Sequence, residues 1–159
     1  MGQAGNDSSA VRIFPPFIYA GLFALGYSVH RFVPAHLWPD GPPPAARAAA
    51  WALLVVWLGL SASAVFLFRR AGTTPNPSRP TTAIVVHGPF RFTRNPMYVS
   101  LVALYLSLTL FVNSVWPLVL LPVVIALVQR QVIAREEAYL EAKFGDEYRA
   151  YKARVRRWL

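Results

Sequence analysis

The chain has 159 residues, 55% of them hydrophobic, and its mean hydropathy of +0.39 is too high for a soluble domain of this size. Its net charge of +9 would ordinarily suggest a nucleic-acid partner, but the basic residues flank apolar runs and do not line one polar face. The absence of cysteine excludes disulfides and cysteine-ligated zinc. We therefore predict an integral membrane protein that contacts membrane lipids and has no nucleic-acid partner.

Two uncharged runs in the amino-terminal part are long enough to cross a membrane. They cover residues 13–29 and 48–68, close to the about 20 residues that a hydrocarbon core of ~30 Å requires. Pro15-Pro16 suits the entry of the first helix, and Arg69-Arg70 ends the second run. Residues 1–10 are polar and no cleavage pattern follows them, so we expect the first run to be retained as a span.

The longest uncharged run covers residues 95–129, and as a single helix it would extend roughly 52 Å, well beyond a bilayer core. Because Asn113-Ser114 and Pro117 lie near its middle, we predict a hairpin of two helices over about 96–112 and 116–134. Asn95 followed by Pro96 predicts the start of the first arm, with the asparagine side chain as its cap.

Beyond Arg130 the sequence becomes strongly charged but keeps helical spacing, which predicts that the last span continues as an amphipathic helix. Four of its residues are expected to face inward: Val132, Ala138, Tyr139 and Ala142. Phe144-Gly145 predicts the end of this helix, and Asp146 the cap of a short closing helix that carries Tyr148 and Tyr151. We expect the basic tail over residues 149–157 to contact lipid headgroups and to have no catalytic role.

Positive charge predicts the orientation in the membrane. Residues 69–94 hold five lysines or arginines and no acidic residue, and residues 130–159 hold eight against five acids. The loop over residues 30–47 holds only two against one acid. Because basic loops stay on the cytoplasmic side, both termini should be cytoplasmic, and we expect the protein in the bacterial inner membrane. The loop before the hairpin and the tail after it then meet at one membrane face.

These elements predict an all-α, polytopic membrane protein with about four transmembrane helices, including a carboxy-terminal hairpin, followed by a cytoplasmic amphipathic helix. We treat residues 1–159 as a single domain. Residues 1–68 supply two spans, and residues 69–159 supply a loop, the hairpin and the tail.

Polar groups that could carry chemistry lie in the segments that this topology brings together. Glu136-Glu137 stands where the last span leaves the lipid. Adjacent residues diverge by about 100° around a helix, so one carboxylate can face a ligand while the other pairs with Arg94 or Arg91. The apolar loop over residues 71–87 is either an interfacial connector or the wall of a ligand pocket. The three histidines are widely separated, which predicts no metal site.

A set of motifs in this half of the chain resembles the isoprenylcysteine carboxyl methyltransferase and phospholipid methyltransferase superfamily. The motifs are Gly88-Pro89-Phe90, Arg94-Asn95-Pro96-Met97-Tyr98, Arg135-Glu136-Glu137 and Phe144-Gly145-Asp146-Glu147-Tyr148 with Tyr151, arranged around the hairpin. The resemblance covers residues 68–159. It implies a membrane enzyme that binds S-adenosylmethionine on the cytosolic side and methylates a lipophilic or lipid-anchored substrate entering from the bilayer.

The resemblance also implies a site. The expected cofactor-binding residues are Ile84, Val85, Phe90, Asn95, Pro96, Met97, Tyr98 and Glu136. The expected catalytic residues are Arg94, Tyr98 and Glu137. Arg94 would anchor a carboxylate or organise the glutamates, the Tyr98 ring would favour the cationic cofactor, and Glu136 would contact its ribose or amino group. Asn95 and Phe90 stand where the family commonly has histidine and tyrosine, so the hydrogen bonds expected there are changed or lost.

Several alternatives stay open from the sequence. A carboxylate acceptor is already ionised, whereas an amine acceptor must lose a proton, for which His87 or Glu137 is the candidate base. A membrane reductase that uses NADPH on a related scaffold would want proton donors inside the spans, which hold almost no ionisable groups. A non-enzymatic membrane adaptor would use the arginine-rich loop and tail only to bind lipid or a partner.

Overall fold

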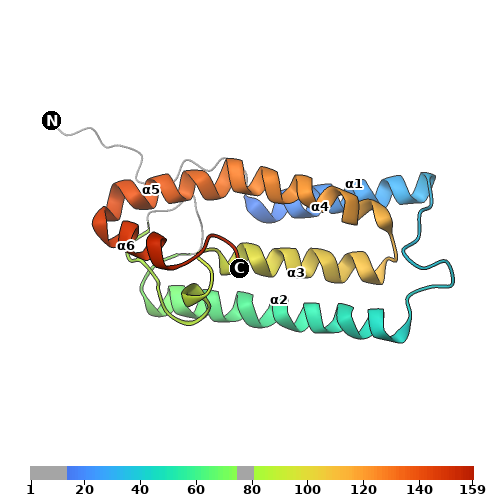
Figure 1. Cartoon of the computed structure of the whole chain (residues 1–159), viewed down its shortest axis with the longest axis horizontal. Helices are drawn as coiled ribbons and strands as arrows, with labels where there is room; N and C mark the ends of the chain where they lie inside the picture. Colours follow the sequence, from blue (N-terminus) through green and yellow to red (C-terminus); the bar gives the residue numbers. More distant parts are fainter. Residues whose placement is uncertain (1–13, 75–80) are drawn as a thin grey trace.

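The computed structural model describes residues 14–74 and 81–159, and all regular structure in these two ranges is helical (Figure 1). In chain order the elements are α1 Pro15–Phe32, α2 Pro44–Arg70, the short 3-10 helix η1 Gly88–Arg91, α3 Pro96–Phe111, α4 Val115–Val128, the π-helical turn η2 Gln129–Ile133, α5 Ala134–Phe144 and α6 Asp146–Arg154. The predicted all-α class is confirmed. The expectations for residues 1–10, and residues 75–80 of the predicted apolar loop, lie outside the described residues.

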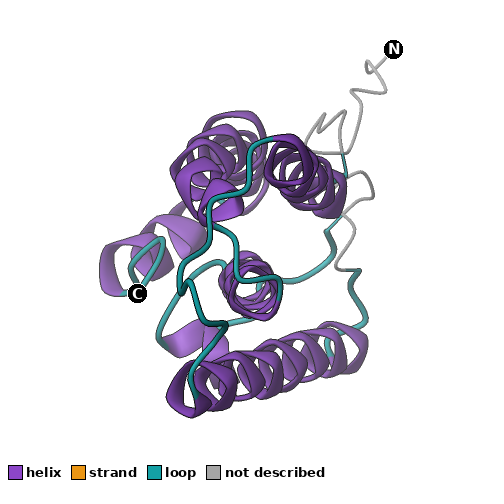
Figure 2. Ribbon diagram, turned by 90° about the vertical axis from the view of Figure 1, so that its right-hand side faces the viewer, coloured by secondary structure: helices purple, strands orange, loops and turns teal. Residues whose placement is uncertain are grey.

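The long helices pack as two pairs that run along the long axis of the molecule (Figure 1). α3 lies against α2, and α4 lies against α1, whereas α3 and α4 contact each other at fewer positions although they are consecutive in the chain. Figure 2 shows the helices from one end, with the connecting loops crossing in front of them. The predicted hairpin is confirmed as a reversal of the chain, but each of its arms packs mainly on another helix.

Small residues allow this close packing. On α2, Ala50 and Ala64 are buried, and the Ser107 hydroxyl of α3 donates to the Ala50 carbonyl over 2.8 Å. On α1, a Cβ atom at Gly26 would lie 2.8 Å from the backbone nitrogen of Pro117 in α4, closer than two such atoms can approach. A glycine is therefore required at the crossing of α1 and α4.

Two helices in the described ranges are long and apolar enough to cross a membrane. They are α2 and the continuous helix Val115–Phe144, which consists of α4, η2 and α5. Only 6% of the apolar window of α2 is buried, so α2 is not the core helix of a soluble protein. Its exposed side chains include Trp51, Val55, Leu58 and Phe66. The second and fourth predicted spans are supported in this way, whereas α1 and the 16-residue α3 remain predicted spans.

The π-helical turn η2 changes which side chains of α5 face inward. We predicted Ala138 and Ala142 on the inner face, but both are exposed. The inner face instead follows Ile133 and Glu137, both buried, and Leu140 and Phe144, both partly buried. A π turn holds one residue more than an α turn and rotates all later residues around the helix axis. The turn therefore directs Glu137 into the molecule.

Two predicted helix caps are wrong. Asn95 stands at the N-terminus of α3 and Pro96 at its first position, but the Asn95 amide does not cap the helix and donates to the Arg157 carbonyl over 2.9 Å. Asp146 is the first residue of α6 and pairs with Arg149, while Gly145 occupies the capping position. Gly145 has a φ of 53°, a conformation that glycine adopts without steric cost, so the chain turns there without a side-chain cap.

The turn between α3 and α4 is tied to the loop after α1. Asn113 has a φ of 51°, and its side-chain amide exchanges two hydrogen bonds with the Trp38 backbone, over 3.0 and 2.8 Å. The Trp116 indole donates to the Val33 carbonyl over 2.7 Å, and Ser114 accepts from the Trp116 amide at the start of α4. We call residues 33–43 and 112–116 together the hairpin end of the molecule.

Candidate functional site

A cavity of about 270 Å³ lies where α1 begins, α2 ends, α3 begins and α5 meets α6. We call this region the cavity end. All ten residues that the sequence predicted as site residues line the cavity: Ile84, Val85, Phe90, Arg94, Asn95, Pro96, Met97, Tyr98, Glu136 and Glu137. The structure therefore brings together the loop after α2, the start of α3 and the start of α5. Their roles in cofactor binding and catalysis stay predictions.

One wall of the cavity is apolar. Val85 and Phe90 are buried, and the Phe90 ring packs edge-on against Phe68 of α2, with 5.2 Å between the ring centroids. The Tyr151 hydroxyl donates to the Phe90 carbonyl over 2.8 Å and ties α6 to this wall. Of the two interpretations of the loop over residues 71–87, the geometry favours a pocket wall, since Ile84 and Val85 line the cavity.

A carboxylate and a phenol stand together at the cavity. The Tyr98 hydroxyl of α3 lies 2.9 Å from both carboxylate oxygens of Glu136 in α5 and donates to them. Tyr98 is buried and Glu136 is partly buried, and both line the cavity. This contact joins the start of α3 to the start of α5. It also leaves acceptor positions on the Glu136 carboxylate for a ligand.

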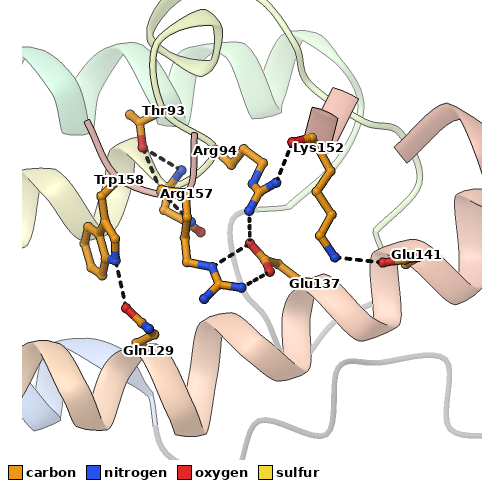
Figure 3. Close-up of polar contacts among 9 residues, drawn as sticks. Thr93, Arg94, Gln129, Glu137, Glu141, Lys152, Arg157 and Trp158 are labelled. Atoms are coloured by element: carbon orange, nitrogen blue, oxygen red, sulfur yellow. Dashed lines mark hydrogen bonds and ion pairs between the residues drawn. The ribbon is translucent and has the colours of Figure 1, made fainter. Parts of the chain in front are cut away.

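The neighbouring carboxylate has a different environment, as the divergence of adjacent helical residues predicted. Glu137 is 5% exposed and accepts from two arginines (Figure 3). Arg94 Nη2 lies 2.7 Å from Oε1, Arg157 Nη2 lies 2.6 Å from Oε2, and Arg157 Nε lies 3.1 Å from Oε1. The expected pairing of one glutamate with Arg94 is confirmed, and the alternative partner Arg91 is not used.

Arg94 is fixed at the base of the cavity, where its side chain is 8% exposed. Besides its contact with Glu137, it donates from Nη1 to the Lys152 carbonyl of α6 over 3.0 Å. Its third donor position, Nε, is buried and has no hydrogen-bond partner among the described residues. A buried donor without a partner costs about 1–3 kcal/mol of the free energy of unfolding.

The C-terminal segment, residues 155–159, forms the back of the site, which sequence reasoning missed. Besides binding Glu137, Arg157 accepts at its carbonyl from Asn95 Nδ2 and from the Thr93 hydroxyl, over 2.9 and 3.1 Å (Figure 3). The Trp158 indole donates to Gln129 Oε1 over 3.0 Å. Arg157 therefore has contacts within the protein that we did not expect of residues 149–157, whose predicted contact with lipid headgroups stays a prediction. No spacing signal could have found Arg157, because it follows Glu137 by 20 residues across a chain reversal.

Two tyrosines of α6 complete the polar boundary. Tyr148 and Tyr151 are buried and line the cavity. Burial raises the pKa of Tyr148 above its usual value, and the Glu137 charge raises it further. Burial raises the pKa of Tyr151 to about 12, so both hydroxyls are neutral near neutral pH. The hydrogen bond to Glu137 raises the pKa of Arg157. The spacing of three residues on one helix face was the available signal for the two tyrosines.

The structure does not support the two bases considered for an amine acceptor. His87 is exposed and does not line the cavity. Glu137 does line it, but both of its oxygens are occupied by arginine donors. Within residues 14–74 and 81–159, no three acidic, histidine or cysteine side chains gather in a way that could hold a metal ion.

Comparison with known proteins places the chain in a family. The model of the family described as phospholipid methyltransferase matches residues 45–147, from the first turn of α2 to the first turn of α6. An uncharacterized protein of Haemophilus influenzae is 48% identical over 63 residues, which make up 40% of this chain and 100% of that protein. No solved structure matches. Because the family model covers more than half of the chain, the chain belongs to the phospholipid methyltransferase family.

Proposed function

We propose that this protein is an integral membrane enzyme that transfers the methyl group of S-adenosylmethionine to a lipid-embedded acceptor. Its family implies methyltransferase activity. The observation that carries the proposal is the cavity itself, because it unites an apolar wall, the Tyr98–Glu136 contact and the buried Arg94–Glu137 ion pair at one end of two long apolar helices. Such groups suit S-adenosylmethionine, which has a sulfonium cation, a zwitterionic amino-acid part and a largely apolar adenine ring.

Each part of the donor has a complementary partner in the cavity. The apolar wall of Ile84, Val85 and Phe90 suits the adenine ring. The Glu136 carboxylate suits the ribose hydroxyls or the amino group, and the Tyr98 ring suits the sulfonium. The Arg94 guanidinium suits the carboxylate of the amino-acid part. A volume of about 270 Å³ is near the lower limit of ~300 Å³ for small-molecule sites, so the apolar tail of an acceptor would stay outside in the lipid.

The chemistry then needs little more than alignment. The acceptor's lone pair forms a bond to the methyl carbon as the bond to sulfur breaks, and the sulfonium leaves as a neutral thioether. Holding the two reactants in line lowers the barrier by several kcal/mol without a covalent enzyme intermediate. Tyr98, Tyr148 and Tyr151 are buried and line the cavity, so reactants that displace water from it would have stronger electrostatic contacts.

The acceptor is an isoprenylcysteine-like carboxylate or the amine of a phospholipid headgroup. A carboxylate attacks as an anion and releases no proton. An amine must lose a proton. Glu136 is then the proposed base, because its oxygens accept a hydrogen bond only from Tyr98 among the described residues. Turnover that stays constant between about pH 6 and 9 would argue against the amine.

We further propose four spans with both termini in the cytoplasm of a bacterial cell and the cavity at the cytoplasmic face. The basic segments over residues 69–94 and 130–159 support this orientation, because described residues of both line the cavity. The chain has no cysteine, so single cysteines can be introduced at exposed positions of the two ends. In spheroplasts, a membrane-impermeant maleimide should label Asp40→Cys directly and Ala71→Cys only after lysis. The opposite pattern would refute the orientation.

Calorimetric titration with S-adenosylhomocysteine tests the proposed function. The purified protein in nanodiscs should bind it, and Glu136→Gln should weaken binding about tenfold, since a hydrogen bond to a charged group contributes about 1.5 kcal/mol or more. Glu147→Gln, which removes an exposed carboxylate of α6, is the matched control and should bind normally. No binding in several detergents and nanodiscs would refute the proposal. Binding of NADPH in its place would favour a reductase, and binding of neither an adaptor.

A further inference from the structure

Two arginines pair with one glutamate beside the cavity: the Arg94 side chain is 8% exposed and that of Arg157 is 34% exposed. Arg94 and Arg157 share one carboxylate, that of Glu137. The nearby Glu141 carboxylate does not pair with either arginine, since it pairs with the Lys152 ammonium over 3.0 Å, and the Glu136 carboxylate accepts from Tyr98. An excess charge taken out of water is costly unless a counter-charge is present. The cluster therefore favours an anionic group from a ligand.

The direction from which this anion would come is given by Arg94. Its Nε is buried and unpartnered within the described part of the chain, and its side chain lines the cavity. Arg157 is not among the residues that line the cavity and approaches Glu137 from the C-terminal segment (Figure 3). Arg94 can thus touch a ligand in the cavity, and Arg157 can act only through Glu137.

We propose that Arg157 is a positioning residue that converts the Arg94–Glu137 pair into an anion-binding subsite. Arg157 binds Glu137 through two nitrogens: Nη2 donates to Oε2, and Nε donates to Oε1, which also accepts from Arg94. Arg94 is then left with a single contact to Glu137, at Nη2, and its Nε stays without a partner within the described part of the chain. Without Arg157, the charges of Arg94 and Glu137 would cancel and the carboxylate would be free to take both nitrogens of Arg94.

The subsite takes a carboxylate or phosphate group, because both are anions with oxygens that a guanidinium recognises. The inference rests on the proposed function, which supplies two sources of such a group: the carboxylate of the methyl donor and the phosphate of a phospholipid acceptor. Arg157 lies beyond the part of the chain that the family model matches, which ends at residue 147. The subsite therefore depends on a contact that the family match does not include.

The test compares two nucleosides on the full-length protein in nanodiscs. S-adenosylhomocysteine carries the amino-acid carboxylate, and 5′-methylthioadenosine lacks it. Arg157→Gln should weaken binding of S-adenosylhomocysteine about tenfold and leave that of methylthioadenosine unchanged within about twofold, if the subsite takes the donor's carboxylate. If it takes the acceptor's phosphate, both nucleosides should bind normally, and the phospholipid concentration for half-maximal turnover should rise about tenfold.

Two further variants separate charge from structure. Arg157→Lys keeps the positive charge and should restore part of the lost affinity. Arg154→Gln removes an exposed charge of the same tail and should match the unmodified protein. Equal weakening of both nucleosides by Arg157→Gln would mean that Arg157 only holds the fold, and no change in nucleoside or phospholipid dependence would also overturn the inference. Failure of the unmodified protein to bind either nucleoside would refute the proposed function itself.

Discussion

The two ends of the molecule are both held by polar contacts between distant segments, yet the contacts differ in kind. At the hairpin end the groups are neutral and paired: the Asn113 amide and the Trp38 backbone each donate and accept once. At the cavity end the groups are charged and incompletely paired, since Glu137 serves two arginines and Arg94 Nε has no described partner. The first arrangement stabilises a turn, and the second is the arrangement for which we propose a ligand.

The largest expected effect is at the centre of the charged cluster. Glu137→Ala removes the shared carboxylate and leaves Arg94 and Arg157 facing each other without a counter-charge. Breaking a buried ion pair in this way costs about 3 kcal/mol or more of the free energy of unfolding. Thermal unfolding in detergent should show a large drop in midpoint, together with loss of nucleoside binding. A midpoint equal to that of the exposed control Glu147→Ala would contradict the buried cluster.

A smaller loss is expected at the hairpin end, and it should be limited to stability. Asn113→Ala removes both hydrogen bonds to Trp38 and places alanine at a positive φ, which together cost about 2 kcal/mol. Asn113→Gly removes the same hydrogen bonds without the backbone strain and should lose less. Affinity for S-adenosylhomocysteine should stay unchanged in the fraction that is folded. A change in that affinity would show that the two ends are coupled.

At the cavity end, Tyr98→Phe is expected to lower nucleoside affinity or turnover while leaving stability nearly unchanged. The substitution keeps the ring and removes the hydroxyl that contacts Glu136, so packing is retained while a charge-assisted hydrogen bond is lost. Affinity for S-adenosylhomocysteine or turnover should fall about tenfold, with a change in unfolding midpoint of about a degree or two. Normal binding and turnover would remove Tyr98 from the proposed site.

The smallest effect is expected at an exposed ion pair of α6. Asp146 and Arg149 pair over 2.6 Å, but both side chains are exposed and Gly145 makes the turn before the helix. Asp146→Ala should leave both the unfolding midpoint and nucleoside binding unchanged. A clear loss of stability would show that Asp146 caps α6 in solution after all.

The sequence predicted much of this arrangement because its signals are local. An uncharged run too long for one crossing forces a reversal, and Asn113 marks where the reversal occurs. The proximity of Arg94 to Glu137 followed from counting spans and charges. The contribution of Arg157 did not follow, because a contact between the C-terminal segment and α5 depends on the direction in which α6 leaves Gly145. The predicted cap at Asn95 was wrong because its side-chain amide donates instead to the Arg157 carbonyl.

The π-helical turn at residues 129–133 has a consequence for comparing this chain with its relatives. A hydropathy profile changes little when one residue is added, so it predicts the chain reversal and the last apolar helix equally well with or without this turn. The π-helical turn does, however, determine which residue of α5 pairs with Arg94. A relative whose helix continues there in α geometry needs one residue fewer to present the same carboxylate. An alignment across this point should therefore carry a one-residue gap, and without that gap it would pair Glu136 with the wrong acid.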